Sequence, residues 1–153
     1  MTRRLGFRTR GGPTQGWGNV YRLASFARYC EGLGDAHAVF FAEGPDEVAG
    51  YLAAQGFEVH MLPEGVSPAR EDELLGGHPR CDVFFAELLE ITPARQAVLR
   101  RHAERLVVFD DLCDHTYEAD LVVSGQALPS HANCALSHPR HPFGVSAWLR
   151  LTQ

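Results

Sequence analysis

The residues with the clearest chemical potential lie near the N-terminus, in the stretch GWGNVYR at 16–22. Glycines let a backbone approach a ligand closely, and a helix beginning at Asn19 would point its positive end at the same place. We therefore expect this turn to bind an anionic or sugar group, with four substrate-binding residues: Arg8, Gly16, Gly18 and Arg22. The alternative is a loop in which Asn19 caps the helix and no ligand binds.

The glycine spacing excludes two common nucleotide-binding motifs. A dinucleotide fingerprint reads Gly-x-Gly-x-x-Gly, whereas Gly16 and Gly18 are followed by Tyr21, which we expect to be too large for close helix–strand packing. No Gly-Lys-Ser/Thr follows, so a P-loop is excluded as well. The sequence therefore predicts no cofactor.

Carboxylates form a second group of candidates. Asp110 and Asp111 end an apolar run, and neighbouring residues of an extended chain face opposite ways. One can then cap the following turn while the other faces a ligand, or both can cap the turn. Asp114 and His115 follow, and an Asp–His pair suits acid–base work. We expect Asp110 to bind substrate, and Asp111 or His115 to handle a proton.

A third group contains His131, Cys134, His138 and His141, whose spacing resembles that of metal ligands. Both of the last two histidines precede a proline, which favours an extended surface loop, so we expect no structural zinc. The four cysteines of the chain form no Cys-x-x-Cys pair, and the N-terminus lacks the apolar core of a signal peptide. Free thiols in a cytoplasmic protein are the expectation.

The composition limits the possible partners. The chain has 153 residues, of which 45% are apolar and 22% charged, as in a single globular domain. Its net charge is −5, yet residues 1–28 carry arginines and no acid. A basic end on an acidic chain favours a local anion site over nucleic-acid binding, which needs a broader basic face. No apolar run approaches the roughly 20 residues of a membrane span.

The elements that must position these residues alternate between strand and helix patterns. Expected strands are 4–9, 37–43, 57–62, 81–87, 105–111 and 119–125, and expected helices are 19–34, 44–56, 70–77 and 92–104. Val- and Phe-rich strands separated by helices predict an α/β fold, a doubly wound, Rossmann-like parallel sheet. Such sheets bind ligands at the carboxyl ends of their strands, where the loop at 10–18, Glu43, Glu87 and Asp110–Asp111 would lie.

GWGNVYR resembles the Gly-x-Gly-His-x-x-Arg motif of the nucleotide-sugar hydrolases of pseudaminic acid biosynthesis and their spore-coat polysaccharide relatives. The resemblance continues through residues 81–126, CDVFFAELLEITPARQAVLRRHAERLVVFDDLCDHTYEADLVVSGQ, and covers roughly residues 4–126. It implies the N-terminal half of a glycosyltransferase-B fold, with residues 1–126 as the Rossmann-like domain and 127–153 as a tail or the start of an interdomain crossing. It also implies a UDP-deoxyamino-sugar ligand and a hydrolase or glycosyltransferase-like activity in polysaccharide biosynthesis.

Two departures from that family bear on catalysis. Asn19 stands where the family has its catalytic histidine, and an amide can orient a water molecule but cannot take its proton. The family's C-terminal domain, which makes most UDP contacts, is not in this sequence. Four interpretations remain open: a piece of a longer protein, a chain that works with a separate nucleotide-binding subunit, a base moved to Asp111 or His115, and a non-catalytic sugar- or partner-binding module. We expect the chain alone to hydrolyse UDP-sugars little or not at all.

Overall fold

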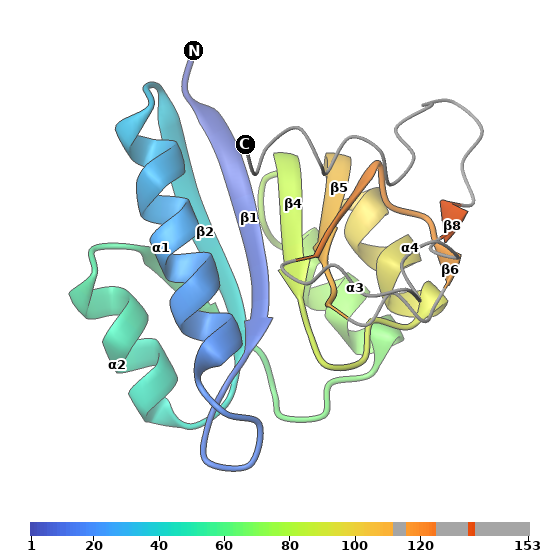
Figure 1. Cartoon of the computed structure of the whole chain (residues 1–153), viewed down its shortest axis with the longest axis horizontal. Helices are drawn as coiled ribbons and strands as arrows, with labels where there is room; N and C mark the ends of the chain where they lie inside the picture. The colour runs from blue at the N-terminus through green and yellow to red at the C-terminus, as the bar shows by residue number, and fades with distance from the viewer. Residues whose placement is uncertain (112–115, 125–134, 137–153) are drawn as a thin grey trace.

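The centre of the protein is a six-stranded sheet in which every pairing is parallel (Figure 1). The computed structural model describes residues 1–111, 116–124 and 135–136. The strand order is β3-β2-β1-β4-β5-β7. The strands are β1 (Arg3–Arg10), β2 (Ala36–Glu43), β3 (Glu58–Met61), β4 (Cys81–Glu87), β5 (Ala103–Phe109) and β7 (Leu121–Val123). A separate parallel pair joins β6 (Thr116–Tyr117) to β8 (Ala135–Leu136).

Helices cover both faces of this sheet, as expected for a doubly wound, Rossmann-like fold. They are α1 (Gly18–Gly32), α2 (Asp46–Ala54), α3 (Pro68–Gly76) and α4 (Pro93–Arg101). Side chains of α1 and α2 share one core cluster with the sheet, and those of α3 and α4 share a second cluster on the other face. The predicted fold class is therefore confirmed. Among the described residues, no helix is long and apolar enough to cross a bilayer.

Local sequence explains where the elements begin. Strand β2 is buried on both faces over its last six residues, which accounts for its continuous run of Ala, Val and Phe. Ser67 and Thr92 cap α3 and α4 by accepting bonds from backbone N–H groups three residues on, and a proline follows each cap. Helix α4 ends at Arg101, earlier than expected, because Ala103 already pairs with Cys81 in the sheet.

The strand order reverses between β1 and β4, which are neighbours in the sheet. The chain leaves β1 for α1 on one face and leaves β4 for α4 on the other. This divergence makes the carboxyl ends of β1 and β4 the topological switch point, the usual ligand position in such sheets. In Figure 1, β1 points to the lower edge of the molecule, where the loop between β1 and α1 is drawn.

Two glycines let the elements meet closely at this edge. A Cβ at Gly11 would lie 2.4 Å from a methyl carbon of Val20, in the first turn of α1. A Cβ at Gly44 would lie 2.3 Å from the carbonyl oxygen of Gly11, and Gly44 has a φ of +139°, which favours glycine. The start of α1 is therefore held directly against the ends of β1 and β2.

Candidate functional site

Three charged side chains meet at the switch point, and we call Arg22, Glu87 and Asp111 the switch-point cluster. Arg22 projects from the first turns of α1, Glu87 ends β4, and Asp111 follows β5. The Arg22 Nε donates to Glu87 Oε1 at 2.8 Å, and its Nη2 bonds the same oxygen. Both Nη atoms also lie 3.2 Å from Asp111 Oδ2. The cluster thus ties α1 to the ends of β4 and β5.

Glu87 is the most enclosed member of the cluster, with 3% of its surface exposed. Burial raises the pKa of its carboxyl, while the hydrogen bond and charge of Arg22 oppose that rise. The carboxylate is therefore more basic than an exposed glutamate, although a cation lies beside it. This combination is typical of groups that exchange protons with a ligand.

The loop between β1 and α1, residues 11–17, which we call the glycine loop, satisfies some of its backbone hydrogen-bonding groups internally. The N–H of Gly12 donates to the carbonyl of Gly16 at 3.1 Å, and the N–H of Gly16 returns the bond at 2.8 Å. These two N–H groups therefore do not face a ligand, which corrects the expectation that Gly16 presents its N–H to an anion. The first turn of α1 offers backbone N–H donors instead. The residue at the N-cap position, Trp17, makes no side-chain hydrogen bond to them, and the first helical N–H groups, from Gly18 on, have no intrahelical partner.

Asn19 lies inside the first turn of α1, one position after Gly18, and not at the cap. Its side chain is half-buried and makes no hydrogen bond to any of the described residues. Asn19 precedes Arg22 by three residues, so the two side chains lie on neighbouring parts of one helix face. The amide therefore sits one turn closer to the helix start than the switch-point cluster.

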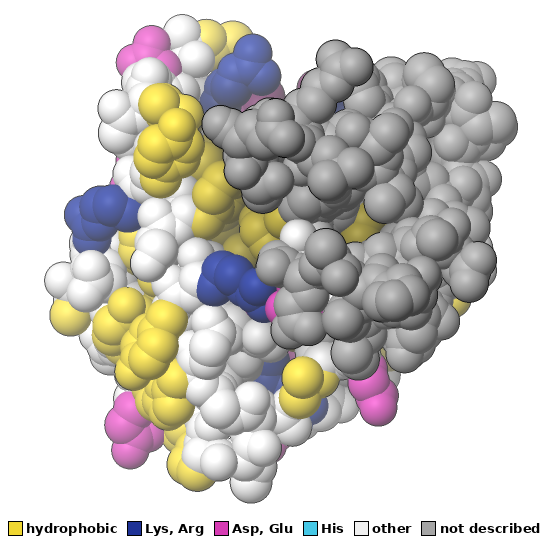
Figure 2. All heavy atoms as spheres, viewed as in Figure 1, with side chains coloured by type: hydrophobic (Ala, Val, Ile, Leu, Met, Phe, Trp, Pro, Cys, Tyr) yellow, Lys and Arg dark blue, Asp and Glu magenta, His cyan; other side chains and the backbone are white. Residues whose placement is uncertain are grey.

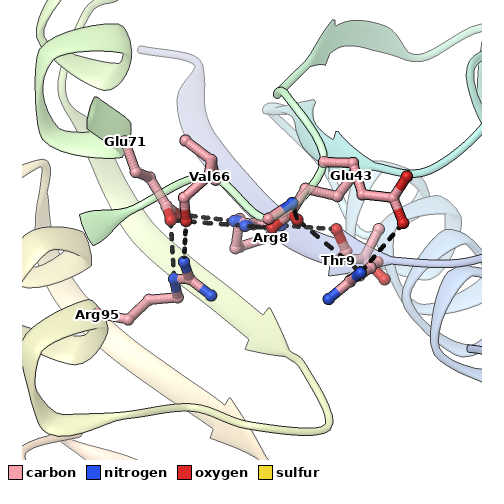
Figure 3. Close-up of polar contacts among 9 residues, drawn as sticks. Arg8, Thr9, Glu43, Val66, Glu71 and Arg95 are labelled. Atoms are coloured by element: carbon pink, nitrogen blue, oxygen red, sulfur yellow. Dashed lines mark hydrogen bonds and ion pairs between the residues drawn. The ribbon is translucent and has the colours of Figure 1, made fainter. Parts of the chain in front are cut away.

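Arg8 belongs to a buried network and not to the ligand edge (Figure 3). Its Nε donates to Glu71 Oε1 at 2.7 Å, Nη1 donates to the carbonyl of Thr9 at 2.8 Å, and Nη2 bonds Glu43. Arg95 pairs with the other oxygen of Glu71 at 2.8 Å. The side chain of Arg8 has no exposed surface, so the expectation that it contacts substrate is corrected: its charge holds β1, β2 and α3 together.

The remaining sequence candidates divide between the described residues and the rest of the chain. Asp110 follows β5, and its Oδ2 accepts a hydrogen bond from the hydroxyl of the buried Tyr117. His115 lies outside the described residues, as do His131, Cys134, His138 and His141 and most of residues 127–153. Within residues 1–111, 116–124 and 135–136, no group of three His, Cys, Asp or Glu side chains could hold a metal ion.

Aromatic side chains lie beside the glycine loop, on the outer side of α1 and α2. The rings of Trp17 and Tyr21 stack with centroids 5.6 Å apart, and Tyr51 of α2 meets Tyr21 edge-on at 5.0 Å. Tyr21 is 47% exposed and lies outside the helix–strand contact, where the comparison with the dinucleotide fingerprint puts its position. Val20 makes that contact instead, against Gly11. Figure 2 shows apolar side chains at the surface over these helices.

No family model and no curated protein matches this chain. Three solved structures share part of the fold at low identity. A crystal structure of BdcA in complex with NADPH is 14% identical, with a TM-score of 0.49, over 73% of this chain and 53% of that chain. The structure of BdcA from E. coli is 14% identical with a TM-score of 0.43, over 68% and 62%. A protein from Mycobacterium paratuberculosis is 12% identical with a TM-score of 0.46, over 73% and 47%.

The chain thus spans about half to three-fifths of the length of these structures. Likeness at this level concerns the general fold, which the strand order already shows. The resemblance to nucleotide-sugar hydrolases stays a prediction, because no match bears on it.

Thr9 is absent from the candidates that the sequence suggests, and Glu87 is expected there only to lie at the ligand edge of the sheet, without a role. A signal for both exists in the strand alternation. In β1 and β4, every second residue from Phe7 and Phe85 faces α1, and that series ends at Thr9 and Glu87. Polar residues at the ends of two such series mark a polar site at the switch point.

Proposed function

We propose that this chain binds a nucleotide-sugar at its switch point, as one half of a nucleotide-sugar hydrolase or glycosyltransferase-like enzyme of bacterial surface-sugar biosynthesis. One observation carries the proposal: α1 begins without a side-chain cap, and one turn later its Arg22 pairs with the carboxylates of Glu87 and Asp111. Backbone N–H groups at a helix start suit a phosphate oxygen, and carboxylates suit sugar hydroxyl groups. The ligand class comes from the sequence resemblance in GWGNVYR.

The proposal includes a second nucleotide-binding unit, in the same polypeptide or in a partner. A ligand of this size is normally enclosed on most sides, whereas the switch-point cluster supplies contacts from one side. The candidates for contact with the ligand are Gly18, Asn19, Arg22, Asp111 and Glu87, together with Asp110, whose Oδ2 also accepts a hydrogen bond from the Tyr117 hydroxyl.

Calorimetric titration with UDP, a panel of UDP-linked deoxyamino sugars and NADPH tests the proposal. We expect UDP-sugars to bind, and Arg22→Gln to weaken that binding at least tenfold, because the substitution releases both carboxylates from their cation. Arg70→Gln is the matched control, since Arg70 pairs with Glu73 on the exposed side of α3. Binding of NADPH without binding of any UDP-sugar would replace the proposed ligand class, and an unaffected Arg22→Gln variant would move the site elsewhere.

A second candidate is a non-catalytic sugar- or partner-binding module, favoured by Asn19 and by exposed large side chains in α1 and at its C-cap. Tyr21, Tyr29 and Leu33 are 47%, 62% and 70% exposed, and such residues often contact other proteins. Binding of a UDP-sugar with no release of UDP at any pH, alone or with the second unit, would support this candidate.

A further inference from the structure

Among the described residues, two buried oxygen atoms at the switch point have no hydrogen-bond partner. The side chains of Thr9 and Glu87 are buried, and in the part of the chain that the structure describes neither Thr9 Oγ1 nor Glu87 Oε2 is bonded. Leaving a buried polar atom unpaired is costly, so native structures rarely keep one without a functional reason or a bound water. Two of them at the same position therefore point to something that bonds both.

The two side chains are direct neighbours. Thr9 and Glu87 are register partners of β1 and β4, so their Cα atoms lie about 4.8 Å apart. Two residues earlier, the rings of Phe7 and Phe85 stack with centroids 5.1 Å apart and both contact Phe26 of α1. Side chains alternate along a strand, so Thr9 and Glu87 face α1 as those rings do.

The carboxylate of Glu87 uses only one of its oxygens for Arg22. Both bonds from the guanidinium reach Oε1, and among the described residues Oε2 bonds none. A hydroxyl oxygen and a carboxylate oxygen can each accept a proton of one water molecule, whose lone pairs then point away from both. One water molecule that enters between these two strand ends can therefore bond both acceptors.

We propose that Thr9 and Glu87 hold the water molecule that attacks the sugar, and that Glu87 takes its proton. This inference rests on the proposed function. In the step, Glu87 Oε2 accepts one proton of the water, and the water oxygen forms a bond to the anomeric carbon. The bond from that carbon to the diphosphate oxygen breaks, and its electron pair leaves with UDP. Glu87 then loses the proton to solvent, which restores the carboxylate.

Glu87 fits this role better than the described candidates Asn19 and Asp111, while His115 lies outside the described residues. Asn19 has an amide with no basic form at neutral pH, and Asp111 shares its Oδ2 with two nitrogen atoms of Arg22. Burial raises the pKa of Glu87 toward the operating pH, which favours proton transfer to it, and Arg22 keeps it ionised before the reaction.

The rate of UDP release at a saturating UDP-sugar, followed from pH 4 to 8, tests the proposal. We expect release by the unmodified chain to be small without the second nucleotide-binding unit, yet measurable above the buffer rate, and to fall in acid as Glu87 becomes protonated. Glu87→Gln should lower the plateau rate toward the buffer rate, by up to about 10²–10⁴-fold, and remove the acid limb, while calorimetric titration still detects binding of the UDP-sugar. Thr9→Val, which keeps shape and removes the hydroxyl, should lower the rate roughly 3–10-fold. The control Glu90→Gln alters an exposed carboxylate of the same loop and should change nothing.

A second variant distinguishes loss of the base from a purely structural effect of replacing Glu87. Glu87→Ala should be inactive, and added formate should restore at least tenfold activity by supplying a carboxylate from solution. UDP-sugar binding with no release above buffer, or a Glu87→Gln variant with the original rate and pH profile, overturns this inference and leaves the binding proposal standing. Failure to bind any UDP-sugar overturns the proposed function, and this inference with it.

Discussion

Replacing Glu71 by glutamine tests whether the buried network of Figure 3 stabilises the fold. Glu71 has no exposed side-chain surface and pairs with Arg8 at 2.7 Å and with Arg95 at 2.8 Å. Glutamine keeps the shape but removes the negative charge between two guanidinium groups. Arg8 would retain Glu43 as its partner, whereas Arg95 would lose its ion pair.

The expected loss follows from that geometry. Removing one partner of a buried ion pair costs about 3–5 kcal/mol, because the other charge stays buried without compensation. We expect the low end of that range for Glu71→Gln, since Glu43 still neutralises Arg8. Domains typically have a free energy of unfolding of roughly 5–15 kcal/mol, so the loss is a large share of the total. At roughly 2–4 °C per kcal/mol, the midpoint of thermal unfolding should fall by about 6–12 °C.

The matched control lies two residues away on the same helix. Glu73 pairs with Arg70 at 2.6 Å, but both side chains are more than half exposed. Such surface pairs contribute about 0–1 kcal/mol, so Glu73→Gln should be nearly neutral. Urea unfolding followed by circular dichroism compares the two variants with the original chain. Equal free energies of unfolding for the two variants would refute the argument that burial decides the value of these ion pairs.

Two further predictions concern packing and pH. Gly11→Ala should lower the free energy of unfolding, measured with urea, by about 1–3 kcal/mol, because the added methyl group would overlap Val20. Gly18→Ala has open space at its Cβ and should change that free energy by less than about 0.5 kcal/mol. Equal losses in the two variants would contradict the close contact at Gly11. Hydrogen bonds from two neighbouring histidines lower the pKa of Glu58 from 4.5 to about 2, so its stabilisation is present above pH 4.5 and is lost as pH falls toward 2. Urea midpoints between pH 6 and 2 should fall less steeply in Glu58→Gln, and an unchanged slope would count against this.

Much of the site can be located from the sequence, but the sequence does not show which candidate residues contact a ligand and which stabilise the fold. The glycine stretch and Asp110–Asp111 each follow an apolar strand pattern, which predicts that both lie at the carboxyl edge of the sheet. Arg8 and Arg22 look alike in the sequence, as two cations near the glycine stretch. The structure separates them. Arg8 points to the α3 face of β1, where it is buried in ion pairs with Glu43 and Glu71. Arg22 lies on α1 and reaches the switch point.

The sequence by itself determined the fold class, because periods of two and 3.6 residues and the turn residues between them are local signals. It also showed that Asn19 is no base, since that is a property of the amide alone. Only the tertiary structure decided which polar side chains meet. The register between β1 and β4 puts Thr9 beside Glu87, and the packing of α1 puts Arg22 over that pair. Burial and pairing depend on residues far apart along the chain, and no local pattern specifies that contact.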